Sequence, residues 1–115
     1  PHTGGYNQAE TQRVGRGVCN PLLVFEADPS QPLPASLLEV EGEGIVVTSL
    51  KPARDGQALM VRLFNAGDRK VTARLKWAKD PKKTWISNPM EDKISSCTKP
   101  VEMVPYQIVT LRVEP

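Results

Sequence analysis

The segment from Ile45 to Asn65 constrains the fold more than any other part of the chain. It holds two apolar runs, 45–50 and 58–65, with a short loop containing Gly56 between them. A strand with one face in water alternates apolar and polar residues, but the second run is largely apolar at both alternating sets of positions. The pattern therefore predicts two β-strands, and it places the second in the middle of a sheet that is covered on both faces.

Further short runs with strand periodicity follow along the chain. The alternation is clearest over residues 70–78, where Val71, Ala73, Leu75 and Trp77 share one face. The full set of predicted strands is 18–27, 37–40, 45–50, 58–65, 70–78, 84–87 and 106–113. No stretch repeats apolar residues at helical spacing over enough turns to predict a helix. With eleven prolines placed mostly between the runs, we expect an all-β fold, an antiparallel β-sandwich of general immunoglobulin-like architecture.

The 115 residues are enough for one hydrophobic core, so a single domain is expected. Residues 1–17 are polar, carry four glycines and show no period, which predicts an irregular N-terminal arm. Residues 18–115 then form the β-sandwich domain. A chain that opens on Pro1 and His2 rather than methionine is expected to be cut from a larger one.

Charge and cysteine usage bear on partners and location. The net charge is +2 and basic residues are scattered among acidic ones, so no nucleic-acid partner is expected. No run approaches the roughly 18 apolar residues of a membrane helix, so no membrane partner is expected either. No asparagine lies in a glycosylation pattern, and Cys19 and Cys97 are predicted to be free thiols. Together these features favour a bacterial cytoplasm.

The residue types needed for catalysis are sparse. His2 is the only histidine, and no cysteine, aspartate or glutamate lies near it at the spacing of a zinc site. It is also a poor base for a nucleophile because it lies in the predicted arm. The carboxylates of 39–43 and 91–92 are neighbours in turns and are predicted to be solvated. We therefore expect no catalytic residue, metal ligand or cofactor in this chain.

Six residues are candidates for contacts with a sugar or with a neighbouring domain. Aromatic rings can stack on the C–H face of a sugar, and an arginine beside an aspartate offers donors and acceptors to hydroxyl groups. For the arginine and aspartate, a simple turn role is the alternative. The candidates are His2, Tyr6, Lys51, Arg54, Asp55 and Trp85.

Four motifs in order resemble the C-terminal β-sandwich domain of glycoside hydrolase family 38, the α-mannosidases. They are Pro1-His2-Thr3-Gly4, Asn20-Pro21-Leu22, the segment Val46 to Asn65 with its Asp55-Gly56 step, and Pro105 to Leu111. The resemblance implies a parent enzyme that is a zinc-dependent retaining hydrolase of α-mannosides. It also implies that the zinc and the nucleophile belong to an N-terminal catalytic domain, so no catalytic residue carries over to this chain.

The resemblance makes the chain a noncatalytic domain whose partner is the catalytic domain of the same polypeptide. Its loops would shape the sugar cleft of that domain. One alternative is a carbohydrate-binding module that holds α-mannosides with Tyr6, Trp85 and the loop 51–57. Another is a general protein-interaction sandwich, which would dimerise through an open sheet edge.

Overall fold

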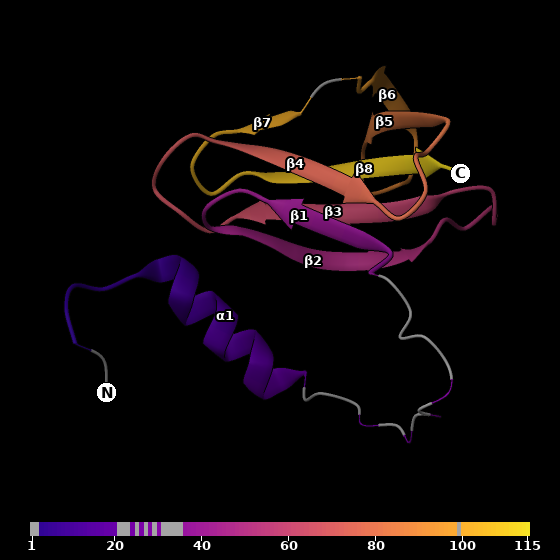
Figure 1. Cartoon of the computed structure of the whole chain (residues 1–115). Coiled ribbons are helices and arrows are strands. Elements are labelled where there is room, and N and C mark those ends of the chain that lie inside the picture. The colour runs from indigo at the N-terminus through magenta and orange to yellow at the C-terminus, as the bar shows by residue number, and fades with distance from the viewer. Residues whose placement is uncertain are drawn as a thin grey trace.

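A computed structural model describes residues 3–20, 24, 26, 28, 30, 36–98 and 100–115. In this part of the chain one helix precedes eight strands (Figure 1). The elements are α1 (Gln8–Cys19), β1 (Leu38–Glu41), β2 (Ile45–Pro52), β3 (Leu59–Asn65), β4 (Val71–Trp77), β5 (Lys83–Ser87), β6 (Lys93–Ser96), β7 (Val101–Met103) and β8 (Ile108–Glu114). No helix among the described residues has the length and apolar character needed to cross a membrane.

The strands form two antiparallel sheets that pack face to face (Figure 1). The smaller sheet has the order β1-β4-β7, and the larger has the order β2-β3-β8-β5-β6. This arrangement confirms the predicted β-sandwich. It also confirms the central position predicted for 58–65, because β3 pairs with β2 on one side and β8 on the other.

The hydrophobic core lies between the sheets. Val61 and Leu63 of β3 and Leu111 of β8 are fully buried, and Ala73 and Met103 cover them from the smaller sheet. Burying a leucine or valine side chain contributes about 1.5–3 kcal/mol, so these positions dominate the stability of the sandwich.

The outer face of the larger sheet is also partly covered. Met60 on β3, and Thr110 and Arg112 on β8, alternate along their strands with the core residues, so their side chains point away from the core. All three are nevertheless buried. Met60 packs with Ala53 and Ala58 of the β2–β3 loop. The strand β3 is therefore apolar on both faces because the core covers one face and the β2–β3 loop covers part of the other.

The prediction of an irregular arm over residues 1–17 without a helix is wrong for α1. Asn7 starts this helix, because its side-chain Oδ1 accepts a hydrogen bond of 3.1 Å from the backbone N–H of Glu10. The sequence pattern hides the helix because Gly15 and Gly17 lower helix propensity and only two valines mark an apolar stripe.

The strand predicted over 18–27 is wrong at its start, because residues 18 and 19 are the last of α1. Residues 21–23, 25 and 27 of that prediction lie outside the described residues. Two short strands, β6 and β7, were not predicted. All four residues of β6 are exposed, so its sequence carries no burial pattern that could reveal it.

Candidate functional site

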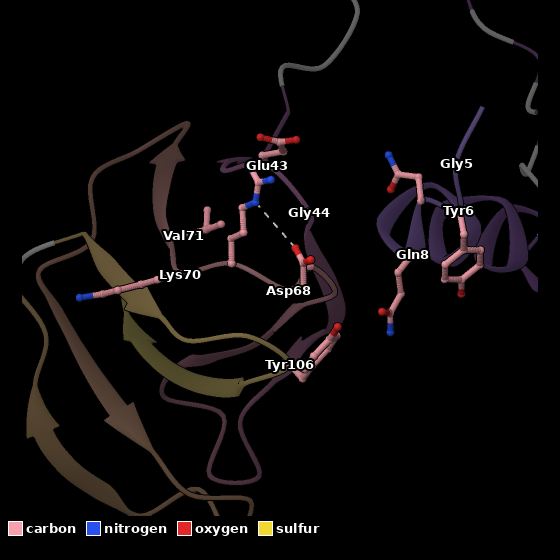
Figure 2. A pocket seen from close by; sticks show the side chains of 12 residues that line it. Gly5, Tyr6, Gln8, Glu43, Gly44, Asp68, Lys70, Val71 and Tyr106 are labelled. Carbon is pink, nitrogen blue, oxygen red and sulfur yellow. Dashed lines mark ion pairs between the residues drawn. The ribbon is translucent and has the colours of Figure 1, made fainter. Parts of the chain in front are cut away.

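An open pocket of about 640 Å³ lies at one end of the sandwich, between three loops and the start of α1 (Figure 2). The loops connect β1 to β2, β3 to β4 and β7 to β8. Figure 2 shows Tyr106 on the sandwich side of this pocket, with Tyr6 and Gln8 on the helix side. The side chains that bring chemistry to the pocket are Tyr6, Gln8, Glu43, Asp68, Arg69 and Tyr106.

One buried amide fixes two of these loops, and the adjoining backbone fixes the third. Asn65, which is fully buried, donates from Nδ2 to the carbonyls of Arg69 (2.8 Å) and Val104 (3.0 Å). Its Oδ1 accepts from the N–H of Gly67 (3.0 Å). The next residue, Ala66, donates its N–H to the carbonyl of Gly44 (2.9 Å). The sandwich side of the pocket is therefore built around a fully satisfied polar hub, which holds loops rigidly.

Tyr106 is held in the pocket by a strained turn. The N–H of Gln107 donates to the carbonyl of Val104 (3.2 Å), which closes a four-residue turn around Pro105 and Tyr106. Tyr106 has φ of 60°, a value that glycine usually supplies at the third position of such a turn. The Gln107 side chain also accepts from the N–H of Val104 (2.9 Å), so both ends of the turn are fastened. The tyrosine ring remains half exposed.

The helix side of the pocket depends on how α1 is attached. Arg16 donates from its guanidinium to the carbonyl of Val47 (2.9 Å). That carbonyl lies on β2, an edge strand, just where the pairing of β2 with β3 becomes irregular. Tyr6 precedes the helix and is 72% exposed, so its ring is open to solvent.

The charges around the pocket are nearly balanced. Asp68 and Arg69 form a loose ion pair of 3.9 Å at the rim. Lys70 points away from the pocket, as Figure 2 shows, and its Nζ lies 2.6 Å from a carboxylate oxygen of Glu102. This hydrogen bond lowers the pKa of Glu102. Glu43 adds one more negative charge to the lining, so the pocket has no excess of positive charge for an anion.

Four of the predicted site residues lie elsewhere, in or beside the outer face of the larger sheet. Glu91 gathers two of them: it accepts from the backbone N–H of Arg54 (2.6 Å) and from Nζ of Lys51 (2.5 Å). The hydrogen bond from Arg54 and then that from Lys51 lower the pKa of Glu91. The carboxylate thereby ties the turn 88–92 to the β2–β3 loop.

The other two lie next to the buried Arg112. Asp55 accepts from Arg112 at 2.6 Å, and the pKa of Asp55 is lowered first by the backbone N–H of Gln57 and then by Arg112. Trp85 is the register partner of Arg112 on β5, and Nζ of Lys93 lies 5.2 Å from its ring centre. We call these residues, with those around Glu91, the sheet-face cluster: Lys51, Arg54, Asp55, Trp85, Glu91, Lys93 and Arg112.

The structure thus brings together Lys51, Arg54, Asp55 and Trp85 but separates them from Tyr6, and His2 lies outside the described residues. A sugar or domain contact for these six stays a prediction. Sequence reasoning missed Asn65 and Glu91, and it did not include Tyr106 among the six candidates. For Tyr106 a signal existed, because a proline before it favours a turn.

Among the described residues, no group of three or more histidine, cysteine, aspartate or glutamate side chains is arranged to hold a metal ion.

Comparison with known proteins gives two matches. A family model described as "Glycosyl hydrolases family 38 C-terminal beta sandwich domain" matches residues 44–111, which run from the residue before β2 into β8. A protein of Halalkalibacterium halodurans named "Putative mannosylglycerate hydrolase" is 29% identical over 99 residues, covering 82% of this chain. The chain spans only 11% of the length of that relative. No solved structure matches the chain significantly.

Proposed function

The chain belongs to the family of glycosyl hydrolase family 38 C-terminal β-sandwich domains, and from this we propose that it is a noncatalytic domain that packs on the catalytic domain of the same polypeptide. The parent enzyme in this proposal is a zinc-dependent retaining α-mannosidase. The name of the Halalkalibacterium relative supports a mannose-containing substrate. In this proposal, zinc and catalysis belong to the catalytic domain.

The orientation of α1 is the observation that carries the packing proposal. Val14 and Val18 lie one turn apart on the same face of the helix and are 63% and 78% exposed. Arg16, on the opposite face at 100° per residue, reaches β2. A helix in an isolated domain normally turns its apolar face inward, and α1 does the reverse. We call Val14 and Val18 the valine face. A neighbouring domain packed on the valine face would remove this apolar surface from water.

A second apolar contact is offered by the turn 88–92 beside the sheet-face cluster. Met90 at its tip is 67% exposed. The turn is nevertheless rigid, because Oδ1 of Asn88 accepts from the N–H groups of Met90 (2.9 Å) and Asp92 (3.0 Å). A fixed turn that presents an exposed methionine suits a domain contact, and we assign to it the shaping of the sugar cleft.

The packing proposal is tested by comparing Val18→Lys with Gln12→Lys, a substitution on another side of the same helix. In the full-length enzyme, Val18→Lys is expected to lower the thermal midpoint, because a lysine ammonium would be buried at the contact. Gln12→Lys is expected to change it little. In the 115-residue chain alone, both residues are exposed, so both variants should stay within about 0.5 kcal/mol of the parent chain. Equal midpoints for the two full-length variants would refute the packing.

The catalytic part of the proposal is tested with a chromogenic α-mannoside. The full-length enzyme is expected to hydrolyse it, and a zinc chelator should remove the activity. The 115-residue chain is expected to give no turnover, and turnover by this chain would refute a noncatalytic role. A stable dimer of the isolated chain would instead favour the protein-interaction alternative.

A further inference from the structure

The two tyrosines of the pocket described above are placed in a way that packing does not explain. Tyr6 and Tyr106 are 72% and 51% exposed, so neither ring contributes fully to a core. Tyr106 in addition occupies a left-handed backbone position where glycine would be unstrained. Strain of this kind persists where the side chain has a use, which makes the ring of Tyr106 a candidate contact for a ligand.

The remaining lining restricts the class of ligand. The carboxylates of Asp68 and Glu43 and the guanidinium of Arg69 leave no excess positive charge, which disfavours phosphates and carboxylic acids. The amide of Gln8 and the Asp68–Arg69 pair offer both donors and acceptors, which suit hydroxyl groups. Aromatic rings suit a ligand with an apolar face. A volume of about 640 Å³ lies in the range of small-molecule sites.

We propose that the pocket between α1 and the sandwich loops binds a neutral sugar ring, with Tyr106 and Tyr6 contacting its faces and Gln8, Asp68 and Arg69 contacting its hydroxyl groups. The site is separate from the sheet-face cluster and does not depend on the packing of the valine face. The Asn65 hub pre-forms its sandwich wall, so that little ordering is needed there when the sugar binds.

The test is a titration of the 115-residue chain with methyl α-mannoside, monitored in amide NMR spectra. Chemical-shift changes are expected at the amides of Gln8, Gly67, Asp68 and Tyr106. We expect a Kd of about 1 mM, because a ligand of this size gains only a limited binding free energy per non-hydrogen atom. Sodium glycerate, as an anionic probe, is expected to give much smaller shifts.

Tyr106→Gly is the decisive variant, because glycine relieves the left-handed strain while removing the ring. We expect its affinity for methyl α-mannoside to fall at least about tenfold, while its thermal midpoint stays the same or rises. Tyr106→Phe keeps the ring and should keep most of the affinity. Met90→Ala, on the turn 88–92, serves as the matched control and should bind normally.

Four results would overturn the proposal. The first is the absence of shifts at about twenty times the expected Kd. The second is a set of shifts confined to Trp85 and the loop 51–57, which would place the sugar on the sheet-face cluster. The third is binding of glycerate as strong as that of the mannoside. The fourth is full binding by Tyr106→Gly. None of these results bears on Val18→Lys in the full-length enzyme, so the packing proposal is tested separately.

Discussion

At the scale of single residues, Asn65 links the core to the pocket. Removing its amide in Asn65→Ala leaves the partly buried N–H of Gly67 and the carbonyls of Arg69 and Val104 without this partner. We expect a loss of about 2–4 kcal/mol in the free energy of unfolding, measured by urea denaturation of the 115-residue chain. Asn65→Asp should also destabilise, because a carboxylate would face two carbonyl oxygens. A neutral effect of both would mean that the β3–β4 and β7–β8 loops are held by other contacts.

Glu91 makes part of the stability dependent on pH. Its pKa is lower in the folded chain than its ordinary value of 4.5, chiefly because the N–H of Arg54 and then Lys51 donate to its carboxylate. The unfolded chain therefore takes up this proton at a higher pH than the folded one. The stabilisation is complete above about pH 4.5 and is lost as the pH falls through the folded pKa. We expect the thermal midpoint of Glu91→Gln to fall less steeply below pH 4.5 than that of the parent chain. Parallel curves would contradict this role.

At the scale of elements, substitutions of two glycines in turns distinguish the energetic cost of backbone strain from that of a steric clash. Gly42 has φ of 148° between β1 and β2, and an added Cβ would lie 2.8 Å from Cγ1 of Ile45 and 3.2 Å from the carbonyl oxygen of Thr72. Gly56 has φ of 70°, and nothing lies within 4 Å of an added Cβ. We expect Gly56→Ala to cost about 1 kcal/mol in urea denaturation and Gly42→Ala to cost about 2–4 kcal/mol. Similar costs would mean that the Gly42 turn can move aside.

The strands were predictable where one face is buried, and the misses have physical causes. The strand β4 follows its sequence pattern because a period of two is visible when side chains alternate between core and water. The strand β3 is covered on both faces and is recognised by its nearly continuous apolar run. The β6 strand has no buried face, and α1 is fixed by a cap and by Arg16 rather than by an apolar stripe. Such elements depend on hydrogen bonds, which leave little periodic trace in a sequence.

The candidate sites were less predictable than the strands. Lys51, Arg54, Asp55 and Trp85 could be proposed because charged and aromatic residues stand out in loops and at strand ends. Glu91, the partner of Lys51 and Arg54, lies forty positions further along the chain than Lys51, and no local pattern relates the two. The pocket between Tyr6 and Tyr106 depends likewise on a helix that the sequence did not reveal.

At the scale of the whole molecule, the sandwich and α1 contribute unequally to stability. The buried residues of the core between the sheets all come from β3 and later strands. α1 is joined to the sandwich by the hydrogen bond from Arg16 to the carbonyl of Val47. A chain of residues 36–115 is therefore expected to unfold cooperatively, with a free energy of unfolding reduced by only about 1 kcal/mol. Urea denaturation measures this directly, and Arg16→Ala in the 115-residue chain should reproduce most of the loss. A shortened chain that fails to fold would instead make α1 part of the folding unit, and the domain boundary predicted at residue 18 would then lie too late in the chain.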